Sequence, residues 1–184
     1  MRTHRLFEVK VGEYEVKDTK FLEEIRDHLK EDREKKSERL QYSIRGKTGY
    51  HTECNLTELD TNWSRRLKSL ILKVASEYSG LTLGDCKVEC WGMCMDEGDF
   101  STIHHHPGCT VCGVLYIDIP FSRLGELVLL DPVYGRRATS KDCYHVDIKP
   151  KDGRGVVFPP WLEHYVEPFE GKGTRYSIAW NVTN

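Results

Sequence analysis

Ile103-His104-His105-His106-Pro107 is the stretch of sequence that the rest of the chain can be read as supporting. Side chains alternate between two faces in an extended segment, so His104 and His106 should point one way and His105 the other. Neutral imidazole is a common ligand of borderline transition metals, and two imidazoles on one strand face offer two adjacent coordination positions. The triplet therefore predicts part of a metal site. A solvated loop with clustered histidines is the alternative interpretation.

A third ligand has to come from a distant part of the chain, and His164 is the strongest candidate. The apolar run Val156-Val157-Phe158 leads into Pro159-Pro160, and a second strand-like segment begins at His164. We therefore predict that His104, His106 and His164 converge on one ion.

The length and composition predict one domain spanning residues 1–184. A chain of 184 residues can fill one core well and is short for two domains. Its 27 Lys plus Arg against 29 Asp plus Glu leave no basic field to hold a nucleic acid or an anionic membrane. No run approaches the roughly 18 to 20 apolar residues of a membrane helix, and no apolar signal core follows the N-terminus. We expect a soluble, cytoplasmic protein without a membrane or nucleic-acid partner.

Seven cysteines are present, and most lie inside or beside strand-like runs. We expect reduced, buried thiols. Cys90, Cys94, Cys109 and Cys112 are an alternative set of ligands for a four-thiolate zinc site. Both pairs lie in apolar strand sequence, whereas such zinc sites need Gly-rich turns, so we favour the buried thiols.

Residues 1–83 carry signals for opening strands, helices and a loop. Alternating apolar and charged residues over 5–16 predict an opening strand or two. A helix capped by Asp18 or Thr19 should follow, with its apolar residues at helical spacing up to Leu29.

The next segments are less regular. Over the charged run 30–39 the helix is expected to run out into solvent or to fray. Residues 41–59 predict a long irregular segment, either a surface loop or an active-site lid. A second amphipathic helix should run from a cap at Asp60-Thr61-Asn62 to a stop at Ser79-Gly80.

Residues 84–184 change to short apolar runs of strand length, broken by Gly and Pro. Eight such pieces after two helices predict an α+β, mainly β fold, namely a β sandwich or jelly roll with helices against one face. The expected strands are Lys87 to Met95, Ile103, Cys109 to Ile119, Gly125 to Leu130, Tyr144 to Ile148, Gly155 to Phe158, His164 to Val166, and Thr174 to Val182.

An ordered series of motifs runs through this half of the chain: His104-x-His106-Pro107, Cys112-Gly113-Val114-Leu115-Tyr116-Ile117, Gly125-Glu126-Leu127, Asp131-Pro132, Pro150-x-x-Gly153, Phe158-Pro159-x-Trp161-Leu162-x-His164-x-Val166, and Arg175-Tyr176-Ser177-Ile178 with Trp180-Asn181. In these motifs, residues 85–182 resemble the iron(II)/2-oxoglutarate-dependent oxygenases of marine phages and bacteria. The resemblance implies a double-stranded β-helix, which is a cupin-like jelly roll, as the catalytic core over 84–184. It also implies one Fe(II), with 2-oxoglutarate and O2 as cosubstrates, in the cytoplasm of a bacterium or of a phage-infected host.

The resemblance further implies roles for single residues. Three protein ligands leave three positions on an octahedral ion, two for a bidentate 2-oxo acid and one for O2. Family members place a basic residue on the following strand to receive the distal carboxylate of 2-oxoglutarate, and Arg175 lies eleven residues after His164. Ser177 resembles the serine of the Arg-x-Ser motif in related oxygenases, and Tyr116 is a further candidate for the same carboxylate. The alternatives are a surface arginine and a solvent-facing hydroxyl.

One position departs from the broader superfamily, which mostly uses His-x-Asp or His-x-Glu where this chain has His106. A neutral imidazole leaves an Fe(II) site one unit more positive than a carboxylate does. We favour His106 as a ligand in a three-histidine site. The alternatives are a carboxylate from Asp96, Glu97 or Asp99, or a vacant position with His106 off the metal.

The leading hypothesis is therefore an Fe(II)- and 2-oxoglutarate-dependent oxygenase that hydroxylates an unidentified peptidyl or small-molecule substrate. The first alternative is a three-histidine, cupin-like dioxygenase that needs no 2-oxoglutarate. The second is a non-catalytic β-sandwich binding module stabilised by a metal such as zinc. A homodimer is compatible with the sequence, which does not indicate an oligomeric state.

Overall fold

The computed structural model describes residues 1–4, 8–36, 48–83, 86–121, 125–139 and 144–184. Three helices lie in these ranges: α1 (Thr19–Lys36), α2 (Asn62–Ser79) and the short α3 (Tyr134–Thr139). The strands are β1 (Gly12–Glu15), β2 (Tyr50–His51), β3 (Lys87–Met95), β4 (Ser101–His104), β5 (Val111–Asp118), β6 (Leu127–Leu130), β7 (His145–Ile148), β8 (Arg154–Phe158), β9 (His164–Val166) and β10 (Arg175–Thr183).

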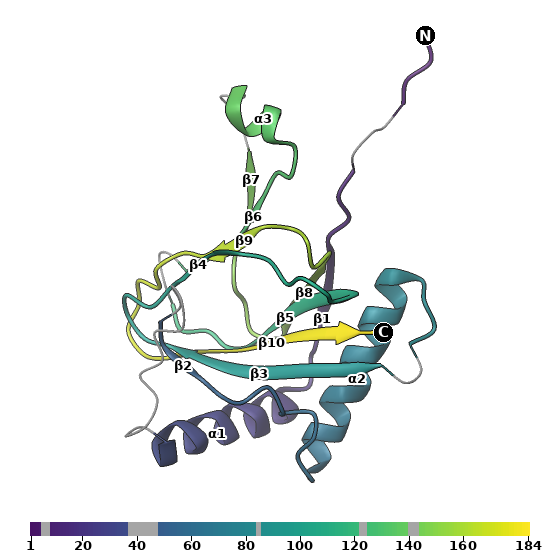
Figure 1. Ribbon diagram of the computed structural model, residues 1–184. Helices are drawn as coiled ribbons and strands as arrows, with labels where there is room; N and C mark the ends of the chain where they lie inside the picture. The colour runs from purple at the N-terminus through teal and green to yellow at the C-terminus, as the bar shows by residue number, and fades with distance from the viewer. Residues whose placement is uncertain (5–7, 37–47, 84–85, 122–124, 140–143) are drawn as a thin grey trace.

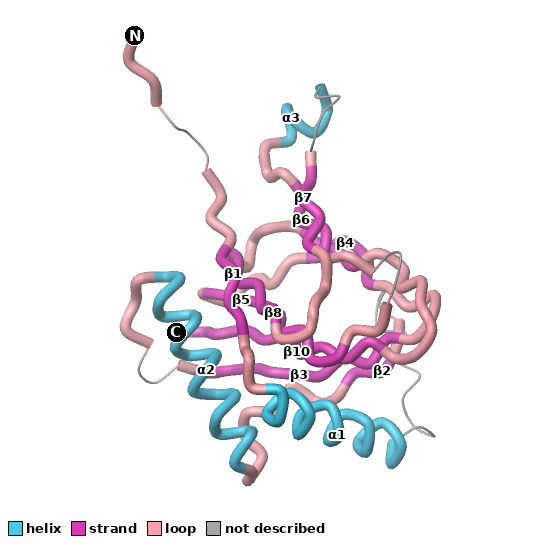
Figure 2. Tube along the Cα trace, turned by 180° about the vertical axis from the view of Figure 1, so that it is seen from behind, coloured by secondary structure: helices cyan, strands magenta, loops and turns pink. Residues whose placement is uncertain are grey.

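The strands form two antiparallel sheets, as the α+β, mainly β prediction required. The larger sheet has the order β1-β8-β5-β10-β3-β2, and the smaller has the order β4-β9-β6-β7. In Figure 1, α1 and α2 lie against one side of the larger sheet and the smaller sheet lies on the other side. Figure 2 shows the same layers from behind. The eight strand-like pieces predicted from the sequence correspond to β3 through β10, with ends shifted by a few residues.

Apolar side chains on the two faces of the larger sheet form two separate cores. The first lies under the helices, where Ile25 and Leu29 of α1 meet Ile178 and Trp180 of β10. The second lies between the two sheets, and includes Tyr116, Leu127, Leu129, Phe158 and Val166. The histidine motif and β10 border this second core, so the two sheets enclose the candidate site.

Both long helices begin where the sequence predicts. The Asp18 side chain accepts a hydrogen bond from the Phe21 amide at 3.1 Å, and the Thr61 hydroxyl accepts one from the Ser64 amide. Helix α2 ends at Gly80, whose φ of 71° is the left-handed conformation that glycine adopts without strain. These caps set where both helices begin and where α2 ends.

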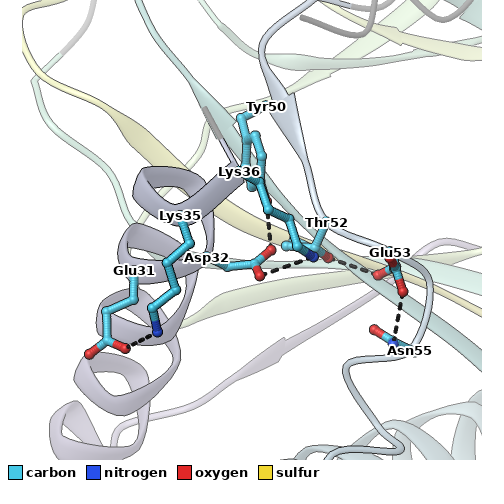
Figure 3. A network of polar contacts seen from close by, with 9 residues as sticks. Glu31, Asp32, Lys35, Lys36, Tyr50, Thr52, Glu53 and Asn55 are labelled. Atoms are coloured by element: carbon cyan, nitrogen blue, oxygen red, sulfur yellow. Dashed lines mark hydrogen bonds and ion pairs between the residues drawn. The ribbon is translucent and has the colours of Figure 1, made fainter. Parts of the chain in front are cut away.

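Of the two expectations for the charged run, fraying is wrong for residues 30–36, which continue α1, and residues 37–39 lie outside the described residues. Two of its side chains bind the sheet. Arg33 forms an ion pair with Asp96, and Asp32 accepts a hydrogen bond from the Tyr50 hydroxyl at 2.5 Å (Figure 3). The side chains of Asp32 and Arg33 therefore contact protein groups where contact with water alone was expected. These contacts hold α1 against β2 and the end of β3.

The irregular segment predicted over 41–59 is described only from residue 48 onward, because 41–47 lie outside the described residues. Residues 52–59 are irregular, as predicted, but the part from residue 48 onward is not a plain surface loop, because several of its side chains are buried. Strand β2 pairs with β3, Tyr50 and Leu56 are buried in the core under the helices, and Thr52 exchanges hydrogen bonds with Gly92. The segment extends the larger sheet, and neither it nor any residue in 48–59 lines the candidate site.

The opening strand is shorter than predicted, since only Gly12–Glu15 pairs with β8, and residues 5–7 lie outside the described ranges. Helix α3, between β6 and β7, was not predicted. No helix among the described residues is long and apolar enough to cross a membrane.

None of the six described cysteines forms a disulfide, as expected. The expected burial holds for Cys90, Cys94 and Cys112, whereas Cys54 is exposed and Cys86 and Cys109 are partly exposed. Cys90 and Cys94 belong to the core under the helices, whereas Cys112 belongs to the core between the sheets. These thiols therefore face opposite sides of the larger sheet and cannot share a zinc ion. Burial raises the pKa of the Cys94 thiol to about 12, which favours an inert packing role.

Candidate metal centre

The three predicted histidines come together between the sheets. His104 ends β4, His164 begins β9, and these two residues are direct partners in the antiparallel pairing of the two strands. His106 lies two residues beyond β4, and its backbone amide donates to the Pro160 carbonyl at 2.8 Å. The proline turn before His164 therefore holds the end of the histidine motif in place.

The side chains converge closely enough to bind one ion. One ligand atom from each of the three rings lies within 4.8 Å of the others. The ring centroids of His104 and His164 are 4.3 Å apart, and that of His106 is 5.3 Å and 5.1 Å from those of His104 and His164. His105 is exposed, as the alternation predicted.

Hydrogen bonds determine which nitrogen of each ring is available to a metal. Nδ1 of His104 lies 2.8 Å from the Thr102 carbonyl, Nδ1 of His164 lies 2.8 Å from the Leu162 carbonyl, and Nδ1 of His106 lies 2.5 Å from Oδ1 of Asn181. Carbonyl oxygens only accept, so each Nδ1 must carry the proton of a neutral ring. The lone pair is then on Nε2, which is the protonation state that a metal ligand requires.

The carboxylates considered as alternative ligands are engaged elsewhere. Asp96 pairs with Arg33 and accepts a hydrogen bond from the Thr174 hydroxyl at 2.7 Å. Asp99 accepts from the Asp96 amide at 2.8 Å, and Glu97 is exposed. None of the three lines the cavity beside the histidines, and in the described ranges the three histidines form the group suited to a metal.

A narrow, mainly apolar cavity adjoins the histidines. The Trp91 ring stacks on that of His106 with centroids 6.1 Å apart, and apolar side chains from both sheets form the walls. The residues that line the cavity are Trp91, Met93, Ser101, His104, His106, Gly113, Val114, Tyr116, Leu127, Phe158, His164, Val166, Arg175 and Ala179.

Arg175 is a buried charge in this cavity, with only 1% of its surface exposed. One guanidinium nitrogen lies 3.5 Å from the Met95 sulfur, and the guanidinium carbon lies 5.3 Å from the centroid of the Tyr116 ring. Among the described residues, no carboxylate lies within ion-pairing distance of it. Burial lowers the pKa of Arg175, and the neighbouring Tyr116 opposes this shift only in part.

Tyr116 and Ser177 lie beside Arg175 and are direct partners in the pairing of β5 with β10. Both side chains are fully buried. The Tyr116 hydroxyl, the Ser177 hydroxyl and Nε of Arg175 have no hydrogen-bond partner within the described part of the chain. Buried polar atoms of this kind normally have partners, so three of them together indicate a place for a polar ligand.

Asn181 is the residue of this site to which sequence reasoning assigned no role. In the sequence it stands only as the second residue of the Trp180-Asn181 motif. The strand alternation places Arg175, Ser177, Ala179 and Asn181 on one face of β10, so a signal was present. The contact with His106 is between residues 75 positions apart, and no local pattern indicates it.

The arrangement of two antiparallel sheets around these residues is that of the double-stranded β-helix of 2-oxoglutarate oxygenases. Residues 89–181 match the model of a family described as "Putative 2OG-Fe(II) oxygenase". The chain therefore belongs to the 2OG-Fe(II) oxygenase family, a class of oxidoreductases, as the motif series predicted. Membership of this family implies Fe(II) and 2-oxoglutarate.

Solved structures support the fold. A prolyl-4-hydroxylase from Pseudomonas putida is 16% identical and superimposes with a TM-score of 0.68 over 95% of this chain and 92% of that one. The viral collagen prolyl hydroxylase of Paramecium bursaria Chlorella virus-1, solved as its 2-oxoglutarate complex, is 10% identical, with a TM-score of 0.63 and 94% coverage of both chains.

HygX from Streptomyces hygroscopicus, solved with nickel and 2-oxoglutarate bound, is 14% identical. Its TM-score is 0.66, over 95% of this chain and 83% of that one. No curated protein sequence matches the chain. At these identities the structural comparisons establish the fold, and the roles of single residues have to be argued from the site itself.

Proposed function

We propose that this chain is an Fe(II)- and 2-oxoglutarate-dependent oxygenase that hydroxylates a peptidyl or small-molecule substrate. The observation that carries the proposal is a group of three convergent imidazoles beside a buried arginine, for which the described residues supply no carboxylate partner. We assign His104, His106 and His164 as metal ligands and Arg175 as the anchor of 2-oxoglutarate. We further propose that residues 1–184 act as one oxygenase domain.

The donor set fits Fe(II). Three neutral imidazoles, each with its lone pair on Nε2, match a borderline metal and leave further coordination positions for 2-oxoglutarate and O2. Bound Fe(II) would supply the oxidising chemistry that converts a substrate C–H bond to C–OH while 2-oxoglutarate and O2 yield succinate and CO2. The protein residues would orient 2-oxoglutarate and exclude water from between the sheets.

The cradle beside the metal site fits the distal carboxylate of 2-oxoglutarate. A guanidinium presents donors in a fork that matches a carboxylate, and the Tyr116 and Ser177 hydroxyls add two more donors. Binding of the carboxylate would neutralise a charge that folding has stripped of water, so the unpaired state of Arg175 favours an anion. In a dioxygenase that needs no 2-oxo acid, this buried arginine would have no cosubstrate carboxylate to bind.

The charge of the site gives a further reason. Three histidines leave the bound ion with its full double charge, where a carboxylate ligand would reduce it by one. Arg175 adds a third positive charge, and no acidic side chain lines the cavity. The dianion 2-oxoglutarate matches this excess, whereas a neutral organic substrate does not.

Anaerobic titration of the purified chain with Fe(II) and 2-oxoglutarate tests the proposal without knowledge of the primary substrate. We expect the weak visible charge-transfer band of a metal-bound 2-oxo acid, which requires both components. Admission of air should then release succinate. Absence of both the band and succinate would overturn the proposed function.

A further inference from the structure

The three histidines of the site differ in what holds Nδ1. His104 and His164 each donate to the backbone carbonyl two residues earlier in the chain, at Thr102 and Leu162. These acceptors belong to the local backbone and are present whatever the side chains are. Nδ1 of His106 instead donates to a side chain, Oδ1 of Asn181 at 2.5 Å, on a distant strand.

Asn181 is held rigidly. It lies in β10 between β3 and β5, opposite Glu89 on one side and Cys112 on the other, and only 8% of its surface is exposed. His106, in contrast, lies beyond the end of β4 and is fixed at its backbone by the Pro160 carbonyl. The direction of the His106 ring therefore depends on a contact with the most extensively paired strand of the larger sheet.

We propose that Asn181 is the positioning residue that makes His106 a metal ligand, an inference that rests on the proposed function. Its amide oxygen keeps the proton of His106 on Nδ1 and aims Nε2 at the ion. The opposite orientation of the amide would present Nδ2–H to Nδ1, put the proton on Nε2 and remove His106 from the metal. The identity of this one acceptor thus decides whether the site has three ligands or two.

The inference also concerns where this chain departs from the His-x-Asp pattern. A carboxylate ligand needs no tautomer to be selected, whereas an imidazole in the same position does. A neutral amide oxygen selects the tautomer without adding a negative charge, so the metal site keeps its excess positive charge for an anionic cosubstrate. One strand then serves both functions, since β10 carries Arg175 at its start and Asn181 near its end.

Three variants test the inference. Asn181→Leu removes the acceptor at similar volume, and Asn181→Asp keeps an acceptor and cannot donate. Thr183→Val lies two residues further on β10 and is the matched control, because Thr183 does not line the cavity. Thermal unfolding of each metal-free protein checks that the fold is retained.

Two measurements do not depend on turnover. Long-range ¹H–¹⁵N NMR of the metal-free protein at alkaline pH reports the tautomer of each histidine. We expect Nδ1–H for all three in the wild type, Asn181→Asp and Thr183→Val, and loss of that preference at His106 alone in Asn181→Leu. Titration with Co(II) should show binding weakened by about 10-fold to 100-fold in Asn181→Leu, the range for loss of an outer hydrogen-bond partner. Asn181→Asp should bind at least as tightly as the wild type.

The outcomes separate this inference from the proposed function. Wild-type tautomer and Co(II) affinity in Asn181→Leu, or weakened Co(II) binding in Asn181→Asp, would overturn the positioning role and leave the oxygenase assignment standing. Conversely, loss of the tautomer and of Co(II) affinity in Asn181→Leu would support the role even if the wild type formed no 2-oxoglutarate chelate.

Discussion

Arg175→Met is the perturbation that most clearly separates a ligand-binding residue from a structural one. Methionine is unbranched, flexible and uncharged, and Arg175 already contacts the Met95 sulfur and the Tyr116 ring. Because no carboxylate in the described ranges pairs with Arg175, the wild-type protein carries an uncompensated buried charge. Replacement of buried ions by apolar side chains of similar volume is often neutral or stabilising by about 1 to 4 kcal/mol. We therefore expect the metal-free variant to unfold at the same or a higher temperature.

The effect on 2-oxoglutarate should have the opposite sign. A guanidinium and a carboxylate form two charge-assisted hydrogen bonds, each worth about 1.5 to 3 kcal/mol. Loss of both at the lower value is about 3 kcal/mol, which corresponds to roughly a 100-fold rise in the dissociation constant. Arg175→Lys keeps the charge without the paired geometry, so its affinity should lie between those of the wild type and Arg175→Met.

Calorimetric titration of 2-oxoglutarate into the Ni(II)-loaded protein measures this loss without turnover. Arg154→Met is the matched control, because Arg154 lies on β8 of the same sheet, outside the lining of the cavity, and its guanidinium pairs with Glu13 at 3.4 Å. The control should bind 2-oxoglutarate as the wild type does. Unchanged affinity in Arg175→Met, or a large fall in its thermal stability, would refute the assignment of Arg175 as an anchor held ready for an anion.

Three further predictions concern the metal site, the helix contact and the pH dependence of stability. His106→Ala should weaken Co(II) binding by more than about 100-fold, beyond the range for loss of a hydrogen-bond partner of a ligand. The His105 side chain is exposed, so His105→Ala should bind Co(II) as the wild type does. Equal affinities in the two variants would contradict the three-histidine site. Tyr50→Phe should lower the free energy of unfolding in urea by about 1.5 to 3 kcal/mol, because the variant loses the hydrogen bond to Asp32. Lys35→Met removes the exposed pair with Glu31 and should lower it by less than about 0.5 kcal/mol. Similar losses in the two variants would argue against the Tyr50–Asp32 contact shown in Figure 3. Burial, and after it the neighbouring Glu126, raise the pKa of Glu167, so the folded state holds this proton more tightly than the unfolded state does and loses stability as the pH rises through the raised pKa. Glu167→Gln should therefore raise the melting temperature near pH 8 and change it little near pH 4. The reverse pattern would contradict the direction of the pKa shift.

Much of the fold could be predicted because the strands of the second half are short apolar runs bounded by glycine or proline. Lys87 to Met95 and His164 to Val166 match β3 and β9 at both ends. Helix α2 has a cap at Thr61, a regular apolar face and a stop at Gly80, and all three signals are local. Local signals of this kind are what a single sequence can show.

The errors occurred where distant contacts override a local pattern. Residues 30–36 look like a solvated, fraying end, yet Asp32 and Arg33 find partners at Tyr50 and Asp96. Residues 48–59 lack strand periodicity, but Leu56 fills the core under the helices and β2 pairs with β3. Neither set of partners could be read from spacing alone.

The site shows the same division. The convergence of His104, His106 and His164 followed from two short motifs, and the structure brings these side chains together. The interpretation in which Asp96 or Asp99 serves as a ligand stayed open because nothing in the sequence places Arg33 and Thr174 around Asp96. Asn181 was missed for the same reason, since its contact with His106 joins β10 to the end of β4 only through the folded sheets.

The central claim is that three imidazoles bind one iron ion while Arg175 binds the distal carboxylate of 2-oxoglutarate. A crystal grown or soaked without oxygen in Fe(II) and 2-oxoglutarate tests both parts at once. We predict an ion bound by Nε2 of His104, His106 and His164, with the distal carboxylate of 2-oxoglutarate on the Arg175 guanidinium. An ion bound at other side chains, or a carboxylate that lies away from Arg175, would contradict the account.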